Sequence, residues 1–465
     1  MLVPEHSLKI QTLGHACLTL YRKGESPLLL TDPWLVGSVY WRSWWLQNYP
    51  SGDEIDWLAT STHVYVTHEH PDHFHMPSIR RLGAGPAYLF PSLAERGYLD
   101  YLIARGYRAE SVEPLRWRQL DQHVSILSIP VWNDDSLLLI DTPNALILNL
   151  NDAKPLPPVL RAIGRVAERI AKPRVLLCSY SPASLVNSFI DDDGIVSLRR
   201  PRHYVDYICG LCERLAIDYY MPFASQAVFL RADSRWANEH RTTYEHLCRY
   251  WQSNARLLPP YTTLDLADFA YSSVPPERYR VMVPAKLEAL TGKRAAEEAA
   301  AEISAAEAAL LTRKLNVFRW LLWLLFRRGF AFQLGEHCLE YDPAHGRLRD
   351  AGVTGGGHGD FVVEVPKLTM KEALRNNHLT DLGITMFIRI RLLRRIDPRK
   401  AYGLFVLFQF DDYGHLAGIG ALLRWLQRGI RYTFVLRLPL PPRGGQPLDL
   451  RSAGVGPGVA AHGPL

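Results

Sequence analysis

Short apolar runs in the first half of the chain predict β-strands, with helices between some of them. Runs rich in β-branched and large apolar residues are typical of strands; they lie at Leu8–Tyr21, Leu28–Thr31, Val64–Thr67, Val124–Ile129, Leu137–Ile140, Ala145–Leu150, Arg174–Ser179 and Asp218–Pro222. The pattern predicts helices over Val159–Ala171 and Tyr204–Leu215, each just before a strand. This mixture of hairpins and helix–strand units predicts an α/β sandwich with mixed sheets.

The composition changes at Lys286–Leu315, an Ala- and Glu-rich stretch that favours helix. We therefore expect a large domain at 1–280, a helical linker at 281–330, a smaller α+β domain at 331–440 and a loose Gly- and Pro-rich tail at 441–465. The smaller domain is predicted to have strands at Phe332–Tyr341, Asp360–Pro366, Thr385–Ile396 and Tyr402–Phe410, and helices at Thr369–Asn376 and Leu416–Gly429. Its pattern is weakly similar to the end of the sterol-carrier fold.

Composition and charge exclude several classes of protein. The chain has 465 residues, 48% hydrophobic and 22% charged, which excludes a disordered or collagen-like chain. A net charge of +6 suits an acidic small molecule and is too small to indicate nucleic acid. Six scattered cysteines and the absence of a signal-peptide pattern predict a cytoplasmic location.

The longest apolar run, Val317–Phe326, is half the length that a membrane span needs. Its two tryptophans, Trp320 and Trp323, with flanking arginines, are typical of a helix on a membrane surface. The same pattern also fits a helix at a domain interface. We therefore expect either peripheral membrane contact or burial between domains.

The segment Thr67–His75 reads THEHPDHFH and follows an apolar strand. Imidazole and carboxylate side chains at this density suit Zn, Fe or Mn, and packing does not explain them. In extended backbone His68 and His70 point to the same side. The segment therefore predicts a metal site. Its last residue, His75, is expected to lie just past that site and to face solvent.

This segment resembles the H-x-H-x-D-H motif of the metallo-β-lactamase fold, and the resemblance extends over about residues 8–270. It implies an αββα sandwich with two divalent metals. By the family's pattern His68 and His70 bind one metal together with a third histidine. Asp72 and His73 bind the second metal, and a later aspartate bridges both.

The later ligands fall on acidic residues. Segments Trp132–Ile140 and Ile147–Asp152 are similar to the stretch that supplies the family's third histidine and bridging aspartate. Asp152 matches the bridging position, and Asp134 falls on the third-histidine position, with Asn133 and Asp135 as alternatives. A carboxylate there favours iron or manganese over zinc. We expect Asp72 or Asp152 also to act in catalysis.

Three segments resemble the sialic-acid hydroxylase branch of the fold: Thr31–Gly37, Leu148–Asp152, and Met221–Ser225 followed by Asn238. Relatives are expected to carry a histidine where this chain has Arg231, so Arg231 becomes a candidate substrate contact and His240 a candidate substitute ligand. The animal enzyme of that branch carries a Rieske domain. This chain lacks the pattern, so an oxygenase would need a separate electron-donor protein.

Four more residues are candidates for substrate contact or for support of the metal ligands. Gly14–Ala16 resembles a turn of the ascorbate-phosphate lactonase and N-acyl-phosphatidylethanolamine phospholipase branches, which makes His15 a candidate. Asp32 is expected to hydrogen-bond a ligand histidine. The Trp-rich loop at 34–49 supplies Trp34 and Arg42, which are expected to line the metal cleft.

Two enzyme functions follow from this site. One is a di-iron oxygenase that hydroxylates a small molecule, anionic or similar to a sugar nucleotide. The other is a metal-dependent hydrolase of a phosphodiester, lactone or other ester, in which a metal lowers the pKa of a bound water. A metal-stabilised binding module without activity is a third reading, which the intact motif opposes.

Overall fold

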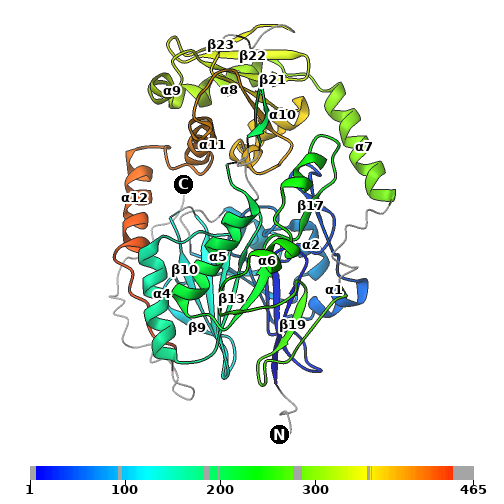
Figure 1. Ribbon diagram of the computed structural model, residues 1–465, viewed down its shortest axis with the longest axis vertical. Helices are drawn as coiled ribbons and strands as arrows, with labels where there is room; N and C mark the ends of the chain where they lie inside the picture. Colours follow the sequence, from blue (N-terminus) through cyan, green and yellow to red (C-terminus); the bar gives the residue numbers. More distant parts are fainter. Residues whose placement is uncertain are drawn as a thin grey trace, which may run out of the picture.

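The computed structural model describes residues 7–92, 97–132, 134–182, 188–196, 198–275, 285–352, 357 and 359–442. Two large sheets form the lower part of the molecule in Figure 1, and a third sheet lies above them. Among these residues no helix is long and apolar enough to cross a membrane. The six cysteines are all free.

The first sheet brings the N-terminal hairpin beside four parallel strands. Its order is β20 (Tyr271–Ser273), β19 (Thr262–Asp265), β1 (Leu8–Leu13), β2 (Cys17–Arg22), β3 (Leu29–Thr31), β6 (His63–Tyr65), β7 (Ala87–Pro91) and β8 (Arg108–Val112). The pairs from β3 to β8 are parallel. The segments that follow β3 and β6 therefore leave the sheet at the same edge.

The second sheet is antiparallel on one side and parallel on the other. Its order is β18 (Arg256–Leu257), β16 (Tyr219–Phe223), β13 (Arg174–Ser179), β12 (Leu146–Asn151), β11 (Ser136–Asp141), β10 (Ser125–Pro130) and β9 (Trp117–Gln119). A small sheet of β17 (Ala227–Phe229), β5 (Trp44–Leu46) and β4 (Ser38–Val39) joins the Trp-rich loop to the segment after β16.

Alternating side chains divide the core into layers. On β11, Leu138 and Ile140 pack between the two sheets, whereas Leu137 and Leu139 pack on the outer face. That outer face is covered by α4 (Pro157–Ile170), α5 (Pro201–Leu215) and α6 (Tyr244–Tyr250). The outer face of the first sheet is covered by α1 (Gly52–Leu58), α2 (Met76–Leu82) and α3 (Gly97–Ile103). The predicted α/β sandwich, with layers in the order αββα, is confirmed.

The C-terminal part has its own sheet and core. Its sheet order is β15 (Gly194–Val196), β14 (Phe189–Asp191), β25 (Arg389–Leu392), β24 (Phe361–Glu364), β21 (Phe330–Leu334), β22 (His337–Asp342) and β23 (Arg347–Asp350). Its helices are α7 (Ala285–Ala300), α8 (Ala305–Val317), α9 (Arg319–Leu325), α10 (Lys367–Asn376), α11 (Pro398–Asp412) and α12 (Ile419–Thr433).

The two parts interlock through the chain. Strands β14 and β15 lie within residues 1–280, yet they extend the C-terminal sheet through β25. In return, Leu436 packs in the outer core of the sandwich, and Trp117 Nε1 donates to the carbonyl of Pro439 at 2.8 Å. The domain limits at 280, 330 and 440 stay predictions, and the chain crosses between the two parts more than once.

One predicted strand is wrong. Tyr402–Phe410 lies inside helix α11. The Asp397 side chain accepts a hydrogen bond from the backbone N–H of Arg399, and Pro398 occupies the first turn, so a strong helix start overrides the strand preference of the aromatic residues. The predicted strand Phe332–Tyr341 is a hairpin, formed by parts of β21 and β22.

Phe189 tests the interlocking. It comes from the first half of the chain and is fully buried in the C-terminal core. Phe189→Ala is expected to lower the free energy of unfolding by about 3–5 kcal/mol, measured by chemical denaturation. Ile195→Ala, on neighbouring β15 and 42% exposed, is the control and is expected to change it by less than about 0.5 kcal/mol. Equal losses of unfolding free energy in the two variants would contradict the burial of Phe189 in the C-terminal core.

Candidate metal centre

The histidine motif follows β6. It lies at the same edge of the sandwich as the segments that follow β3 and β12. Asp32 follows β3, and Asp152 follows β12 across the sandwich. The turn between β1 and β2 brings His15 to the same place. Gly14 at φ +52° makes this turn possible, because a Cβ there would lie 2.8 Å from the carbonyl oxygen of Trp34.

Two overlapping groups of donor atoms form at this edge. One contains His15, Asp72 and His73, and the other contains His68, His73 and Asp152; within each group the donor atoms lie within 4.8 Å of one another. Asp72 Oδ2 lies 3.3 Å from His73 Nε2 and 3.5 Å from His15 Nε2. His68 Nε2 lies 2.7 Å from Nδ1 of His70. The structure thus brings His15, His68, His70, Asp72, His73 and Asp152 together.

Two carboxylates hold the outer ring nitrogens of two histidines. Asp32 Oδ2 lies 3.3 Å from Nδ1 of His73, and Asp135 Oδ1 lies 3.2 Å from Nδ1 of His68. A carboxylate on Nδ1 favours the tautomer whose Nε2 lone pair is available. Both histidines therefore direct Nε2 toward the cluster.

The carboxylate of Asp32 is itself fixed on the other side. It accepts hydrogen bonds from the Thr67 backbone N–H at 2.8 Å and from the Thr67 hydroxyl. Asn151 donates to that hydroxyl at 2.6 Å. Asp32 and Asn151 both have positive φ, at 42° and 56°, a conformation that costs energy in non-glycine residues and often marks a functional site.

Several buried polar atoms at the cluster have no hydrogen-bond partner among the described residues. These are His15 Nδ1, His73 Nε2 and Asp152 Oδ1. Buried polar atoms are rarely left unpaired. The donor set of imidazole nitrogens and carboxylate oxygens fits Zn, Fe or Mn. The residues present therefore fit a bound metal.

Electrostatics within the protein show a strongly acidic environment. Burial lowers the pKa of His68, but Asp135 and Asp152 together outweigh burial and raise the pKa to about 9. Burial likewise opposes protonation of His73, yet Asp72 and Asp32 raise its pKa well above the usual value. Burial raises the pKa of Asp381 to about 8, with help from Asp412 and Glu69.

Burial dominates at the two other histidines. It lowers the pKa of His15 to about 4, and burial together with His68 lowers the pKa of His70 to about 3. Both rings therefore stay neutral at physiological pH, which is the form that binds a metal.

Asp134 and Asp135 were the described candidates for the third ligand of the first metal, and neither belongs to the donor groups. Asp134 turns away from the cluster: its carboxylate binds His415 Nε2 at 2.6 Å and Arg428 at 2.8 Å. Asp135, the neighbouring alternative, contacts His68 at the ring nitrogen that faces away from the cluster. Asn133 lies outside the described residues. Asp134 has φ +61°, which sends consecutive carboxylates in different directions.

Arg231 and Arg42 also differ from the expectation. Arg231 is buried, donates to Asp233 and to the carbonyl of Trp41, and lies over the ring of Phe387 at 4.3 Å. Neither arginine is among the described residues that line the cavity at the cluster. Arg231 therefore joins the Trp-rich loop to the C-terminal part.

The remaining predicted residues lie outside the donor groups that the described residues form. Trp34 is buried with its ring 5.7 Å from that of His15. His240 is absent from the donor groups formed by the described residues. His75 is buried rather than solvent-facing, because its Nδ1 pairs with Ser78 at the start of α2.

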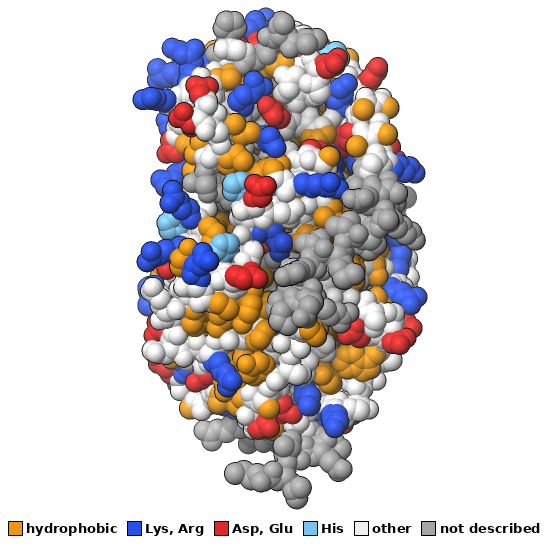
Figure 2. Space-filling model, turned by 45° about the vertical axis from the view of Figure 1, so that its right-hand side comes forward, with side chains coloured by type: hydrophobic (Ala, Val, Ile, Leu, Met, Phe, Trp, Pro, Cys, Tyr) orange, Lys and Arg blue, Asp and Glu red, His pale blue; other side chains and the backbone are white. Residues whose placement is uncertain are grey.

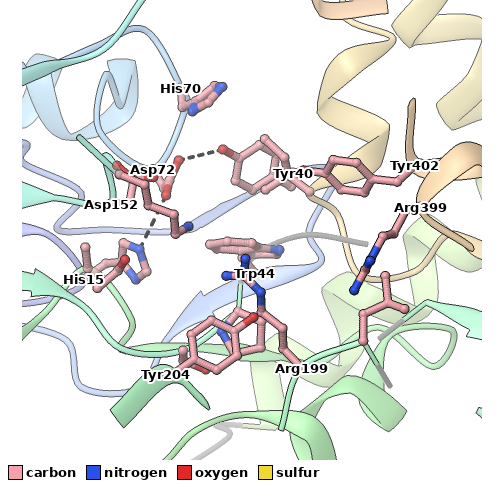
Figure 3. A pocket seen from close by; sticks show the side chains of 17 residues that line it. His15, Tyr40, Trp44, His70, Asp72, Asp152, Arg199, Tyr204, Arg399 and Tyr402 are labelled. Carbon is pink, nitrogen blue, oxygen red and sulfur yellow. Dashed lines mark hydrogen bonds and ion pairs between the residues drawn. The ribbon is translucent and has the colours of Figure 1, made fainter. Parts of the chain in front are cut away.

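Two tyrosines that the sequence did not indicate contact the motif. The Tyr40 hydroxyl donates to Asp72 Oδ1 at 2.7 Å (Figure 3). Tyr413, at the end of α11, pairs with Nε2 of His70 at 3.2 Å. Tyr40 is placed by a turn with positive φ from Tyr40 to Arg42. In the sequence, Tyr40 is marked only by its place in the long Trp-rich loop, and no pattern marks Tyr413.

A cavity of about 450 Å³ opens at the cluster, between the sandwich and the C-terminal part. His15, His70, Asp72 and Asp152 line it, as the metal interpretation requires. In Figure 3 Arg199 and Arg399 lie across the pocket from these acidic groups. Its other lining residues include Tyr40, Trp44, Lys154, Tyr204 and Tyr402. Its volume suits a small molecule.

Comparison with curated proteins points to one named activity. Cytidine monophosphate-N-acetylneuraminic acid hydroxylase of Danio rerio is 30% identical over 150 residues, which is 30% of this chain and 25% of that protein. The human protein named as the inactive form is 28% identical over 153 residues, 31% of this chain and 30% of that protein. The match thus spans only about a quarter to a third of each relative's length.

The four-layer sandwich and the histidine motif at the end of β6 together establish the fold. The N-terminal sandwich has the metallo-β-lactamase fold. The chain matches no family model. Solved structures with likeness to it include a metallo hydrolase of Ignicoccus hospitalis, at 12% identity, TM-score 0.32, and 58% and 100% coverage of the two chains. A possible metal-dependent hydrolase of Veillonella parvula is 11% identical with a TM-score of 0.39, and the match covers 56% of this chain and 99% of that chain.

The neighbouring carboxylates give a direct test of this metallo-β-lactamase-fold site. Asp135→Asn removes the charge that orients His68, so metal affinity is expected to fall about 10- to 100-fold. Asp134→Asn is the matched control, and its metal affinity is expected to stay near that of the unaltered protein. Chelator competition measures both affinities. A loss confined to Asp134→Asn would restore Asp134 as the ligand.

Proposed function

We propose that this protein is a dinuclear metal-dependent oxygenase that hydroxylates a small acidic molecule. The observation that carries the proposal is the pair of overlapping donor groups, which share His73 and converge on one cavity. The printed names of the curated relatives support hydroxylation as the reaction. The fold itself serves many reactions and does not choose between them.

The donor atoms suggest an assignment of ligands. His68, His70 and Asp152 would hold one metal, and His15, Asp72 and His73 the other, with Asp152 placed to bridge. His15 then takes the place of the histidine that relatives were expected to carry at position 231. Iron is proposed because hydroxylation needs redox chemistry, which zinc lacks.

Two bound iron ions would supply the reduction of O2 and the transfer of one oxygen atom to carbon. The balanced reaction converts R–H, O2, two electrons and two protons into R–OH and water. The electrons would come from a separate donor protein. Asp32 and Asp135 orient His73 and His68, while Tyr40 holds Asp72 through its hydroxyl.

The walls of the cavity favour an acidic substrate. Lys154, Arg199 and Arg399 come from three separate segments and all line it. Guanidinium and ammonium groups bind carboxylate and phosphate through charge-assisted hydrogen bonds. The rings of Trp44, Tyr204 and Tyr402 offer flat apolar surface beside these charges. An acidic sugar or sugar nucleotide combines both features.

Metal analysis and O2 uptake test the reaction. Protein purified after growth with iron is expected to hold about two irons per chain and to absorb visible light. With a reductant it is expected to consume O2 faster when cytidine monophosphate-N-acetylneuraminic acid or another acidic sugar is added. Colourless protein with zinc only, and hydrolysis of phosphodiesters or lactones, would establish the hydrolase alternative.

The assignment of His15 is tested separately. His15→Ala removes one donor of the second group, so the metal content is expected to fall from about two ions to one per chain. His240→Ala is the control and is expected to leave the content unchanged. Elemental analysis of dialysed protein measures both. Metal loss in His240→Ala, with none in His15→Ala, would make His240 the ligand.

A further inference from the structure

Helix α12 presents an apolar stripe to solvent. Ile419, Leu423, Leu426, Ile430 and the capping residue Phe434 are between 43% and 80% exposed. Their spacing of three or four residues places them on one face of the helix. The opposite face carries Arg428, whose guanidinium binds Asp134 at 2.8 Å. Arg428 therefore holds the helix to the protein, and the apolar stripe faces away from this contact.

Helix α9 exposes a second apolar surface. Trp320 is 73% exposed and Leu324 is 61% exposed, and Leu321 and Trp323 lie beside them. Arg319 lies over the ring of Trp320 and Arg327 over that of Trp323. Helices α9 and α12 both lie on the left side of the molecule in Figure 1. Exposed apolar surfaces of this kind mark interaction sites.

The charges around these helices select the partner. Residues 413–440 contain Arg424, Arg428, Arg431 and Arg437 and no Asp or Glu. Residues 313–328 likewise contain no acidic residue. In the view of Figure 2, Lys and Arg side chains also gather along the upper left edge, over the C-terminal part. A second copy of this chain would bring arginines against arginines across a two-fold axis, which is unfavourable.

We propose that α12 and α9 bind the surface of an anionic phospholipid membrane. At 15 residues α12 is about 22 Å long, too short to span a bilayer, and it would lie in the plane of the headgroups. The aliphatic stripe enters the acyl boundary, and Trp320 and Trp323 occupy the interface. The exposed Arg424 and Arg431 contact lipid phosphates. This binding is independent of the reaction proposed for the metal site.

Vesicle co-sedimentation of the full-length, metal-loaded protein tests the proposal. We expect binding to vesicles of phosphatidylcholine with phosphatidylserine, weak binding to phosphatidylcholine alone, and release by salt. The double variant Leu423→Glu, Ile430→Glu is expected to bind at least roughly 10-fold more weakly. Trp320→Ala combined with Leu324→Ala tests α9 in the same way and is also expected to weaken binding.

Ile103→Glu is the matched control, because Ile103 is 51% exposed on α3 and belongs to neither helix. Its binding should equal that of the unaltered protein. All variants change exposed residues, and circular dichroism with metal content confirms their folding. Absence of binding to the anionic vesicles, or equal binding by Leu423→Glu, Ile430→Glu, would overturn the proposal. A dimer that this variant dissociates would assign the stripe to a second copy and also overturn it.

Discussion

The structure of the site depends on balancing buried negative charge. Asp32, Asp72, Asp135 and Asp152 lie around His68 and His73, and burying a charge without a partner is costly. His68 and His73 respond by raised pKa values, and Asp381 by a pKa of about 8. Two divalent cations would bring four positive charges to four carboxylates. Metal binding would then replace protons on the histidines and stabilise the fold at the same time.

The motif could be predicted because its residues are neighbours in the sequence and follow a strand. His68, His70, Asp72 and His73 needed no long-range information to be placed together. Asp152 was found because it ends a strand in a position that the resemblance specifies. The choice between Asp134 and Asp135 could not be made in this way, because it depends on the positive φ of a single residue. In a turn, consecutive side chains follow no fixed alternation.

Contacts between distant segments were beyond the sequence pattern. Tyr413 lies 343 residues from His70, and Arg399 and Tyr402 reach the cavity from a helix that was expected to be partly strand. For Arg231, the sequence suggested a role that the contacts of its side chain do not support. Its position after β17 suggested a substrate contact, but Asp233 and the Trp41 carbonyl capture its guanidinium. Packing between segments that are distant in the sequence determines these roles.

This packing also connects the outer surface to the metal centre. His415, just after α11, and Arg428 on α12 both bind the carboxylate of Asp134. Asp135 follows directly and orients His68, while Tyr413 contacts His70 from the same segment. Helix α12 thus cannot move far from the sandwich without breaking the contacts of Asp134. The backbone at Asp134, with φ +61°, is therefore held in place by the C-terminal segment. Arg399 and Tyr402 of the C-terminal part line the same cavity as His70 and Asp152, so the cavity needs both parts of the chain.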